Sequence, residues 1–323
     1  MAISPLPETT VRTLVSGQVL ITPDRIIKEL IDNALDAGAT TIAIELDATT
    51  VGDLQVKDNG SGVRDVDRDA MCVRHTTSKI NRFEDLTDNV VQTLGFRGEA
   101  LASLVEVASK VTVTTRTATD LVAEKWTVGS NGCRIDCQNV SAGAGTSVQA
   151  INLFAGLPVR RKLFEKAAKK SIAAVRAMLI TTALLHRDLR LVFRLTRSAS
   201  SSVVYLGGKT VADAIASTLG RDVLLETEIG VVEFDDGWGI EFAVPKLTAN
   251  WKVPSRRDFK HVLYAVDGRP LSTVLPTVKK LAKVMKDKMR TTNRGLVFCN
   301  IKTPRDRVCY DVNVEPGKDD VIF

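Results

Sequence analysis

Residues 28–39 read KELIDNALDAGA, and together with the residues just before them they predict an amphipathic helix. The predicted buried face consists of Ile26, Ile27, Leu30, Ile31, Ala34 and Leu35. The opposite face carries Glu29, Asp32, Asn33 and Asp36. Polar faces of such helices are usually just solvated, and on this window alone that interpretation is favoured. Glu29 and Asn33 are nevertheless i and i+4 neighbours, whose side chains can address one small ligand.

The composition is that of a globular protein of more than one domain. The chain has 323 residues, 44% of them hydrophobic and 25% charged, and domains usually contain about 150 residues. The start, MAISPLPETT, lacks signal-peptide features, and no apolar run approaches the roughly 20 residues that span a bilayer. Five widely spaced cysteines and three histidines form neither a disulfide framework nor a zinc pattern. We therefore expect no membrane partner, a reducing compartment and free, mostly structural thiols.

Positive charge is concentrated in two helical runs. The net charge is +6 and the pI is about 9.1, which favours polyanionic partners. Residues 158–170 and 278–290 contain one acidic residue each among many lysines and arginines. Either run alone is more simply a solvated helix face, but two of them in a nucleotide-binding protein would suit a phosphate backbone. Aromatic residues are only 5% of the chain, so base stacking is not supported.

The pattern along the chain predicts two α+β units. TIAIELDA at 41–48 alternates as a half-buried strand, and a further short strand leads into DNGSG. Four consecutive antiparallel strands are predicted between 111 and 154, followed by one long helix over about 160–186 and the strand RLVFRLT. The segment SASSS at 198–202 is the best boundary. We expect domains at 1–202 and 203–323, the second containing a basic helix at 271–290.

Three glycine-containing segments accompany the first helix: DNGSG at 58–62, GFRGEAL at 95–101 and GAGT at 143–146. Each alone can be an ordinary turn. Their order, however, resembles the GHKL ATPase superfamily. Within it the chain is similar to MutL mismatch-repair ATPases through KELIDNALDAGA, DNGSG, HTTSKI, TLGFRGEAL, GAGTSV, LFAGLPVRRKLF, VDGRP and DVNVEPGK. The resemblance implies a GHKL (Bergerat) α/β sandwich, a mixed sheet with helices on one face, followed by a smaller ribosomal-protein-S-five-like α+β domain.

The resemblance also implies roles for the helix and for the adenine site. Glu29 matches the general base that activates the water attacking the γ-phosphate, and Asn33 matches the ligand of a Mg²⁺ ion shared with ATP. Asp58 matches the aspartate that accepts a hydrogen bond from the adenine amine. Gly60 and Gly62 let the backbone approach the base, and Thr146 supports the same site, unless it is an ordinary strand residue. No role is implied for Asp32 or Asp36.

The remaining nucleotide contacts are expected in an ATP lid, residues 75–98, and in the second domain. The lid residues and the phosphate cradle at the start of the next helix are Thr77, Ser78, Lys79, Gly95, Phe96, Arg97, Gly98 and Glu99. No Walker P-loop is present. Lys318 is expected to reach the γ-phosphate, although Glu315 and Gly317 depart from the usual pattern around it. Arg160 and Arg161 are either structural or DNA-facing, and Arg269 is a family landmark.

The function implied by the resemblance is a slow ATPase switch in mismatch repair. ATP would order the lid, the ordered lids and the first 20 residues would dimerise, and hydrolysis by Glu29 would reset this state. DNA would be bound through its phosphate backbone without sequence readout. SGQV and HTTSKI resemble the eukaryotic post-meiotic-segregation type, which implies a nuclear protein in a heterodimer with another MutL homologue; a bacterial form would be cytoplasmic. The alternatives are an ATP-binding scaffold with negligible turnover and another GHKL ATPase, a chaperone or a topoisomerase. No nuclease site is expected.

Overall fold

The computed structural model describes residues 22–74, 76, 99–198, 202–246, 248, 260–272, 275–289 and 295–304. The chain divides into two compact units. Among the described residues, the first unit contains those up to 178 together with 190–204, and the second contains 179–189 and those from 205 onward. The predicted domain boundary at residue 202 stays a prediction.

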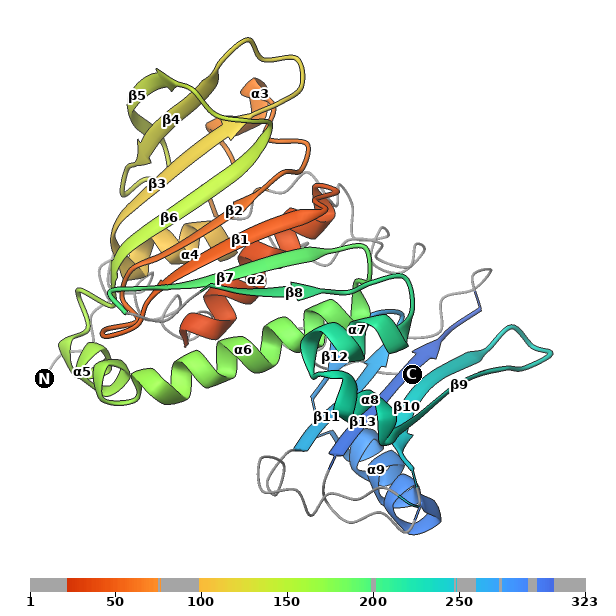
Figure 1. The fold of residues 1–323 in the computed structure, drawn as a ribbon. Coiled ribbons are helices and arrows are strands. Elements are labelled where there is room, and N and C mark those ends of the chain that lie inside the picture. Colours follow the sequence, from red (N-terminus) through yellow and green to blue (C-terminus); the bar gives the residue numbers. More distant parts are fainter. Residues whose placement is uncertain are drawn as a thin grey trace, which may run out of the picture. The chain divides into compact units, whose positions relative to one another are not determined.

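The first unit is built on an eight-stranded mixed sheet (Figure 1) with the order β5-β4-β3-β6-β2-β1-β7-β8. The strands are β1 (Thr41–Asp47), β2 (Leu54–Asp58), β3 (Ala108–Arg116), β4 (Ala123–Val128), β5 (Arg134–Val140), β6 (Gly145–Leu153), β7 (Arg190–Thr196) and β8 (Val203–Leu206). Strand β1 pairs in parallel with β7 and antiparallel with β2. The predicted mixed sheet is therefore confirmed.

The position of β6 corrects the expectation of four strands paired in sequence order. Strand β6 pairs with β3 and β2, so it lies inside the sheet rather than beside β5. The reason lies in the side chains. Strand β6 buries Val148, Ala150 and Leu153, which suits an interior position, whereas five consecutive residues of β5 are exposed. Polar β5 is the strand that tolerates the edge.

Two helices of the first unit, α2 (Pro23–Asp36) and α4 (Ala100–Val107), cover the same face of this sheet (Figure 1). Helix α2 contacts β1, β2 and α4, while α4 contacts β3. Proline in the first turn of α2 is compatible with a helix start because its missing N–H would lack an intrahelical acceptor there. The predicted apolar stripe is buried, apart from half-buried Leu35. Helix α3 (Asp65–Arg68) is a single turn.

The single helix predicted over 160–186 is wrong, because two helices occupy this segment. Helix α5 (Pro158–Lys166) is followed by its C-cap residue Ala167, and α6 (Ala168–Leu185) begins directly after it. Helix α5 has no buried residue and stacks the ring of Phe164 on Phe154, with 5.0 Å between centroids. Helix α6 instead buries Val175, Leu179 and Ala183. The two segments pack against different surroundings, which is consistent with the break between them.

The second unit has a five-stranded sheet with the order β12-β11-β13-β10-β9. The strands are β9 (Thr227–Glu233), β10 (Gly239–Pro245), β11 (Lys260–Val266), β12 (Arg269–Leu271) and β13 (Gly295–Lys302), and the helices are α7 (Val211–Thr218), α8 (Arg221–Leu225) and α9 (Pro276–Met289). The basic helix begins at Pro276 rather than at 271, because 269–271 form β12.

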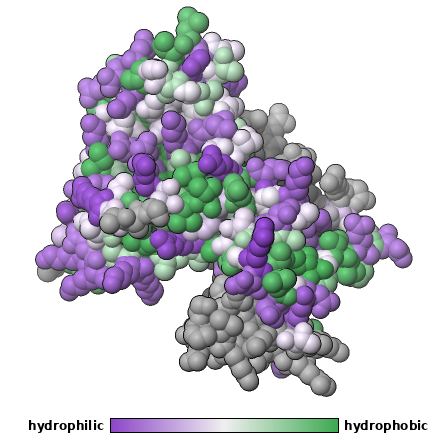
Figure 2. Space-filling view, in the orientation of Figure 1, coloured by the Kyte–Doolittle hydropathy of each residue, from purple (hydrophilic) through white to green (hydrophobic). Residues whose placement is uncertain are grey.

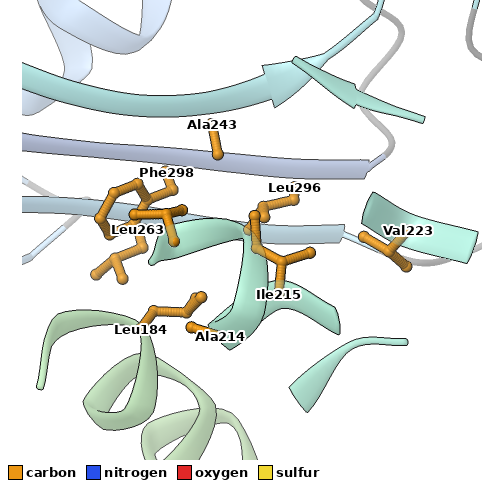
Figure 3. Close-up of a cluster of buried hydrophobic side chains, with 9 residues drawn as sticks. Leu184, Ala214, Ile215, Val223, Ala243, Leu263, Leu296 and Phe298 are labelled. Atoms are coloured by element: carbon orange, nitrogen blue, oxygen red, sulfur yellow. The ribbon is translucent and has the colours of Figure 1, made fainter. Parts of the chain in front are cut away.

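Two hydrophobic clusters stabilise the second unit. The larger cluster joins the end of α6 and helices α7 and α8 to the sheet, and Figure 3 shows Leu184, Ile215 and Phe298 within it. The smaller cluster packs Val278 of α9 against Tyr264 and Cys299 of the sheet. Burial of these apolar surfaces is the main contribution to the stability of the unit.

The four described cysteines are free thiols, as the wide spacing of cysteines in the sequence predicts. Cys72 and Cys299 are buried and Cys133 and Cys137 are exposed, and all four are free thiols. Burial raises the pKa of Cys72 to about 12 and that of Cys299 to about 11, so both thiols are inert at neutral pH. Within the described residues, no helix is long and apolar enough to cross a bilayer.

Candidate functional site

Helix α2 places Glu29 and Asn33 one turn apart, and both side chains are half-buried. At this separation side chains on a helix are about 5–6 Å apart at Cβ. Asp32 was expected on a solvated face, but this residue is only 8% exposed. Its Oδ2 lies 3.2 Å from the Nζ of Lys28. Lys28 therefore compensates this carboxylate, so Asp32 contributes to the packing of the helix. The roles of Glu29 and Asn33 stay predictions.

Asp58 lies at the end of β2 and is held by two backbone donors. Its Oδ1 accepts hydrogen bonds from the N–H of Gly60 at 2.8 Å and from the N–H of Thr146 at 3.1 Å. No hydrogen bond from a described residue reaches its Oδ2. Burial raises the pKa of the Asp58 carboxyl, and the two N–H donors oppose that effect. The backbone thus fixes one oxygen, while the other has no donor among the residues that the structure describes.

The glycines of DNGSG are required first by the protein itself. A Cβ on Gly60 would lie 2.8 Å from the carbonyl oxygen of Ala37, just beyond the C-terminus of α2. Gly62 has a φ of +72°, and a Cβ there would overlap the carbonyl of Arg116 on β3. The sequence-based reason, close approach to a base, is a separate one. The loop can lie between α2 and β3 only because both residues lack side chains.

Two further residues that the motif analysis missed hold this loop. Asn59 Oδ1 accepts hydrogen bonds from the backbone N–H groups of Thr40 and Thr41, at 2.9 and 2.8 Å, and so connects the loop to the turn after α2. Thr115 on β3 is 1% exposed, and its Oγ1 accepts from the N–H of Val63 at 2.9 Å. The same hydroxyl lies 3.0 Å from the Oγ1 of Thr146. Thr115 thereby connects the end of the loop to the strand that carries Thr146.

A sequence signal existed for Thr115. Val111 and Val113 alternate inward on β3, so Thr115 falls on the same buried face. A hydroxyl at an inward position requires hydrogen-bond partners. That requirement alone would have marked Thr115 as part of a polar site.

Arg68 holds the segment after the loop against the sheet. Its Nε donates to the carbonyl of Val63 at 3.1 Å, and its guanidinium pairs with Glu124 at 3.1 Å and with Asp120. The residue is only 6% exposed. A longer contact of 3.6 Å joins the guanidinium to Asp65, one turn earlier in the chain. Glu124 and Asp120 are more than 50 residues away in sequence, so local patterns carried no signal for these two contacts.

Most of the predicted lid lies outside the described residues. The same holds for Lys318 and for Glu315 and Gly317, which depart from the usual pattern around it. The lid residues concerned are Thr77, Ser78, Lys79, Gly95, Phe96, Arg97 and Gly98. Glu99 is described and lies directly before α4, where its carbonyl accepts from the N–H of Ser103 at 2.8 Å. The roles predicted for these residues stay predictions.

A bound Mg²⁺ ion would take most of its ligands from the nucleotide phosphates and water rather than from protein side chains. In the part of the chain that the structure describes, no group of three His, Cys, Asp or Glu side chains is arranged to hold a metal. A Mg²⁺ ion that takes most of its ligands from phosphate oxygens and water needs only one or two protein oxygens. The amide oxygen of Asn33 beside Glu29 fits that requirement.

Comparison with known proteins agrees with this geometry. A sequence profile for histidine kinase-, DNA gyrase B- and HSP90-like ATPases matches residues 21–144, which include α2, the DNGSG loop and α4. The chain is 32% identical over 326 residues to the human protein described as PMS1 protein homolog 1. It is 33% identical over 327 residues to the DNA mismatch repair protein MutL of Sphingopyxis alaskensis. The chain belongs to the MutL family of DNA mismatch repair proteins.

Solved structures of a DNA repair protein and of a MutL ATPase domain share the fold. The crystal structure of the N-terminal domain of a DNA repair protein matches 97% of this chain and 92% of that chain, with a TM-score of 0.78 and 25% identity. The MutL ATPase domain of Aquifex aeolicus complexed with ADP matches 88% of this chain and 92% of that chain, with a TM-score of 0.60 and 20% identity. The predicted α+β fold of GHKL type is confirmed.

The matches cover only part of the MutL relatives. This chain aligns over 98% of its own length with the human relative but over 34% of that protein, and it covers 51% of the bacterial one. It therefore corresponds to a portion of each relative. The activity and partners of a whole MutL protein come to this chain only as proposals.

Proposed function

We propose that this chain binds ATP with Mg²⁺ and hydrolyses it slowly, as the ATPase region of a MutL-type mismatch repair protein. The observation that carries the proposal is the Asp58 carboxylate. Its Oδ1 is occupied by the backbone donors of Gly60 and Thr146, while no described residue occupies its Oδ2. An acceptor of this kind selects a base with an exocyclic amine, as adenine has. Guanine presents a carbonyl oxygen in the equivalent place and would be disfavoured.

The chemistry is assigned to the exposed side of α2. Glu29 would accept the proton of the attacking water, and the amide oxygen of Asn33 would help to hold Mg²⁺. Bound Mg²⁺ supplies charge neutralisation on the β- and γ-phosphates. The N-terminus of α4, which follows Glu99, would present backbone N–H groups to phosphate. Lys318 would add positive charge at the γ-phosphate.

The proposed cycle includes dimerisation. ATP would order residues 75–98, and these residues together with the first 20 would pair with those of another MutL homologue. The similarity to a human PMS1 homologue supports the eukaryotic heterodimeric type and hence the nucleus. We also retain as proposals the domains 1–202 and 203–323 and the ribosomal-protein-S-five-like assignment for the second.

DNA binding would use the phosphate backbone. Helix α5 has no buried residue, and exposed Lys162, Lys166, Lys169 and Lys170 extend from it into α6. Arg160 lies over the ring of Phe154, 5.6 Å from its centroid, and Arg161 pairs with Glu165 at 3.0 Å. These contacts support a partly structural role for both arginines, and the exposed lysines would be the main cations for a polyanion.

The proposal is tested by nucleotide titration and turnover on the same preparation. We expect calorimetry to detect ATP binding in the presence of Mg²⁺, at least about tenfold tighter than GTP binding. Phosphate release should be slow and should stop when EDTA removes the metal. Equal affinity for ATP and GTP would contradict the Asp58 assignment. Binding without any turnover would favour the alternative of a non-hydrolysing scaffold.

A further inference from the structure

Strand β9 forms an edge of the sheet in the second unit, with no second partner strand among the described residues. It is the terminal strand of the order β12-β11-β13-β10-β9 and pairs only with β10 among the described strands. Edge strands present a row of backbone N–H and C=O groups to which another chain can add. The chemistry of this edge therefore decides what kind of segment it accepts.

The hydrogen-bond register shows which backbone groups face outward. In an antiparallel pair, residues alternate between facing the partner strand and facing away from it. Phe234 donates to the carbonyl of Trp238 at 2.8 Å, and Lys246 donates to that of Glu226 at 2.9 Å, one at each end of the β9–β10 ladder. The register places the odd-numbered residues of β9 in the outward positions. Ile229, Val231 and Glu233 thus offer their backbone groups to a neighbouring strand.

The side chains on this arm, residues 226–245, are apolar and exposed. Val231 is 56% exposed, Val232 44% and Phe234 49%. In Figure 2 hydrophobic surface gathers along this arm, at the right of the view. Exposed apolar side chains on a free edge favour association, so proteins usually protect such edges with lysine, proline or a bulge. Strand β9 contains no lysine or proline and pairs with β10 without a register shift, and its charged side chains are carboxylates.

Strand β5, an edge of the other sheet, shows the contrast. Its pairing with β4 is interrupted by a register shift, and Asp136 within it has a φ of +54°. Arg134 at its start forms ion pairs with Asp69 and Glu124. These features disturb the edge that β5 presents. The regular edge of β9 is therefore not a general property of this protein's sheets.

The charge of the arm indicates what would bind. Residues 226–245 contain six carboxylates and no lysine or arginine, in a chain whose net charge is +6. Glu241 is buried and pairs with Arg187 at 2.7 Å. Glu228, Glu233 and Asp235 are exposed and form no ion pair with any residue that the structure describes. The arm is thus a local acidic surface on a basic protein.

We propose that β9 is a docking edge that accepts an extended segment of a partner protein, rich in lysine or arginine and in β-branched residues, as an added strand. Backbone hydrogen bonds to Ile229, Val231 and Glu233 would give the affinity, and alternating side chains would give the selectivity. Pairing of two copies of this chain through β9 is disfavoured, because it would place the carboxylates of both arms side by side.

The proposal is tested with synthetic nine-residue peptides and fluorescence anisotropy on the whole chain. One peptide alternates valine with lysine and the second alternates valine with glutamate. A third is the lysine peptide with N-methyl groups on the residues that would face β9. We expect the lysine peptide to bind with an affinity that falls as salt is raised. The glutamate and N-methylated peptides should bind at least about tenfold more weakly.

Matched variants of Val231 locate the site. Val231→Pro removes an outward N–H while keeping the ladder with β10, and it should weaken binding of the lysine peptide at least about tenfold. Val231→Thr keeps the edge donor and serves as the control. Equal binding of lysine and glutamate peptides, or no binding of the lysine peptide, would overturn the proposal. If Val231→Pro lowers the melting temperature, the test rests on the N-methylated peptide bound to the unmodified chain. Binding of this peptide as tight as that of the lysine peptide would also overturn the proposal.

Discussion

Replacing Asp58 with asparagine separates the two functions of its carboxylate. The amide oxygen of asparagine can still accept from the N–H groups of Gly60 and Thr146, which Oδ1 accepts from at 2.8 and 3.1 Å. The amide nitrogen then takes the place of Oδ2 and presents two donors where the adenine amine also donates. The substitution therefore changes the ligand-facing atom and conserves the loop.

The size of the effect follows from these contacts. A hydrogen bond to a charged group is worth about 1.5–3 kcal/mol, and opposing two donors adds an unsatisfied group. We expect Asp58→Asn to weaken ATP binding by about 2–4 kcal/mol, or roughly 30- to 700-fold. Stability should change by less than about 1 kcal/mol, because burial raises the pKa of Asp58 and neutralisation removes the cost of its charge at pH 7.

Calorimetric titration with ATP and with GTP measures this prediction. Because the new amide can donate to the carbonyl oxygen of guanine, the ratio of ATP to GTP affinity should fall in Asp58→Asn. Asp58→Ala is the matched control, which should lose ATP binding and also cost about 2 kcal/mol of stability by leaving two N–H groups unpaired. Unchanged ATP affinity in Asp58→Asn, with the variant folded, would refute the assignment of Oδ2 to the base.

Three further predictions concern stability, measured by urea unfolding. Arg68→Ala should cost about 2–3 kcal/mol, because it leaves two partly buried carboxylates without one of their partners. Arg64→Ala is the control: the Arg64 side chain is 73% exposed, so the change should alter stability by less than about 0.5 kcal/mol, and equal effects of the two substitutions would contradict the role assigned to Arg68. The hydroxyl of Ser103 is the buried side-chain polar atom without a hydrogen-bond partner in the described residues, so Ser103→Ala should be neutral or stabilising, and a loss above about 1 kcal/mol would reveal a partner. Burial lowers the pKa of His261, so the unfolded state binds more protons, and stability should fall as the pH drops below about 6.5. His261→Gln should remove this contribution, and an unchanged dependence of stability on pH in the variant would contradict the role of His261.

The local elements were predictable because their signals are local. The spacing of apolar residues predicted α2, which begins three residues before the first residue of the predicted stripe, and strict alternation predicted β1, which ends one residue earlier than expected. The place of β6 between β3 and β2 depends instead on contacts such as that between Gln55 and Ser147, 92 residues apart. The break between α5 and α6 coincides with the stacking of Phe164 on Phe154. Helical periodicity contains no information on either contact.

In the candidate site, too, local motifs were predictable from the sequence and contacts between distant residues were not. Asp58 and the glycines of DNGSG were found through a motif, but the structure adds that Gly60 and Gly62 are forced by Ala37 and Arg116 of the protein itself. Thr115 was missed because no motif includes it, although its inward position on β3 would have marked it. Asp32 was assigned to a solvated face. Its i,i+4 spacing from Lys28 is compatible with their ion pair, but helical spacing cannot show that the packing of the helix leaves Asp32 only 8% exposed.

The central claim is that Glu29 acts as the base of an ATPase, and turnover of Glu29→Ala beside the unmodified chain tests it most directly. Both proteins should bind ATP with affinities within about threefold of each other, since Glu29 is assigned to the water rather than to the base or ribose. Loss of a general base lowers rates by about 100- to 10,000-fold, so phosphate release by Glu29→Ala should fall by at least about 100-fold. Equal turnover by the two proteins, at saturating ATP and Mg²⁺, would contradict the account.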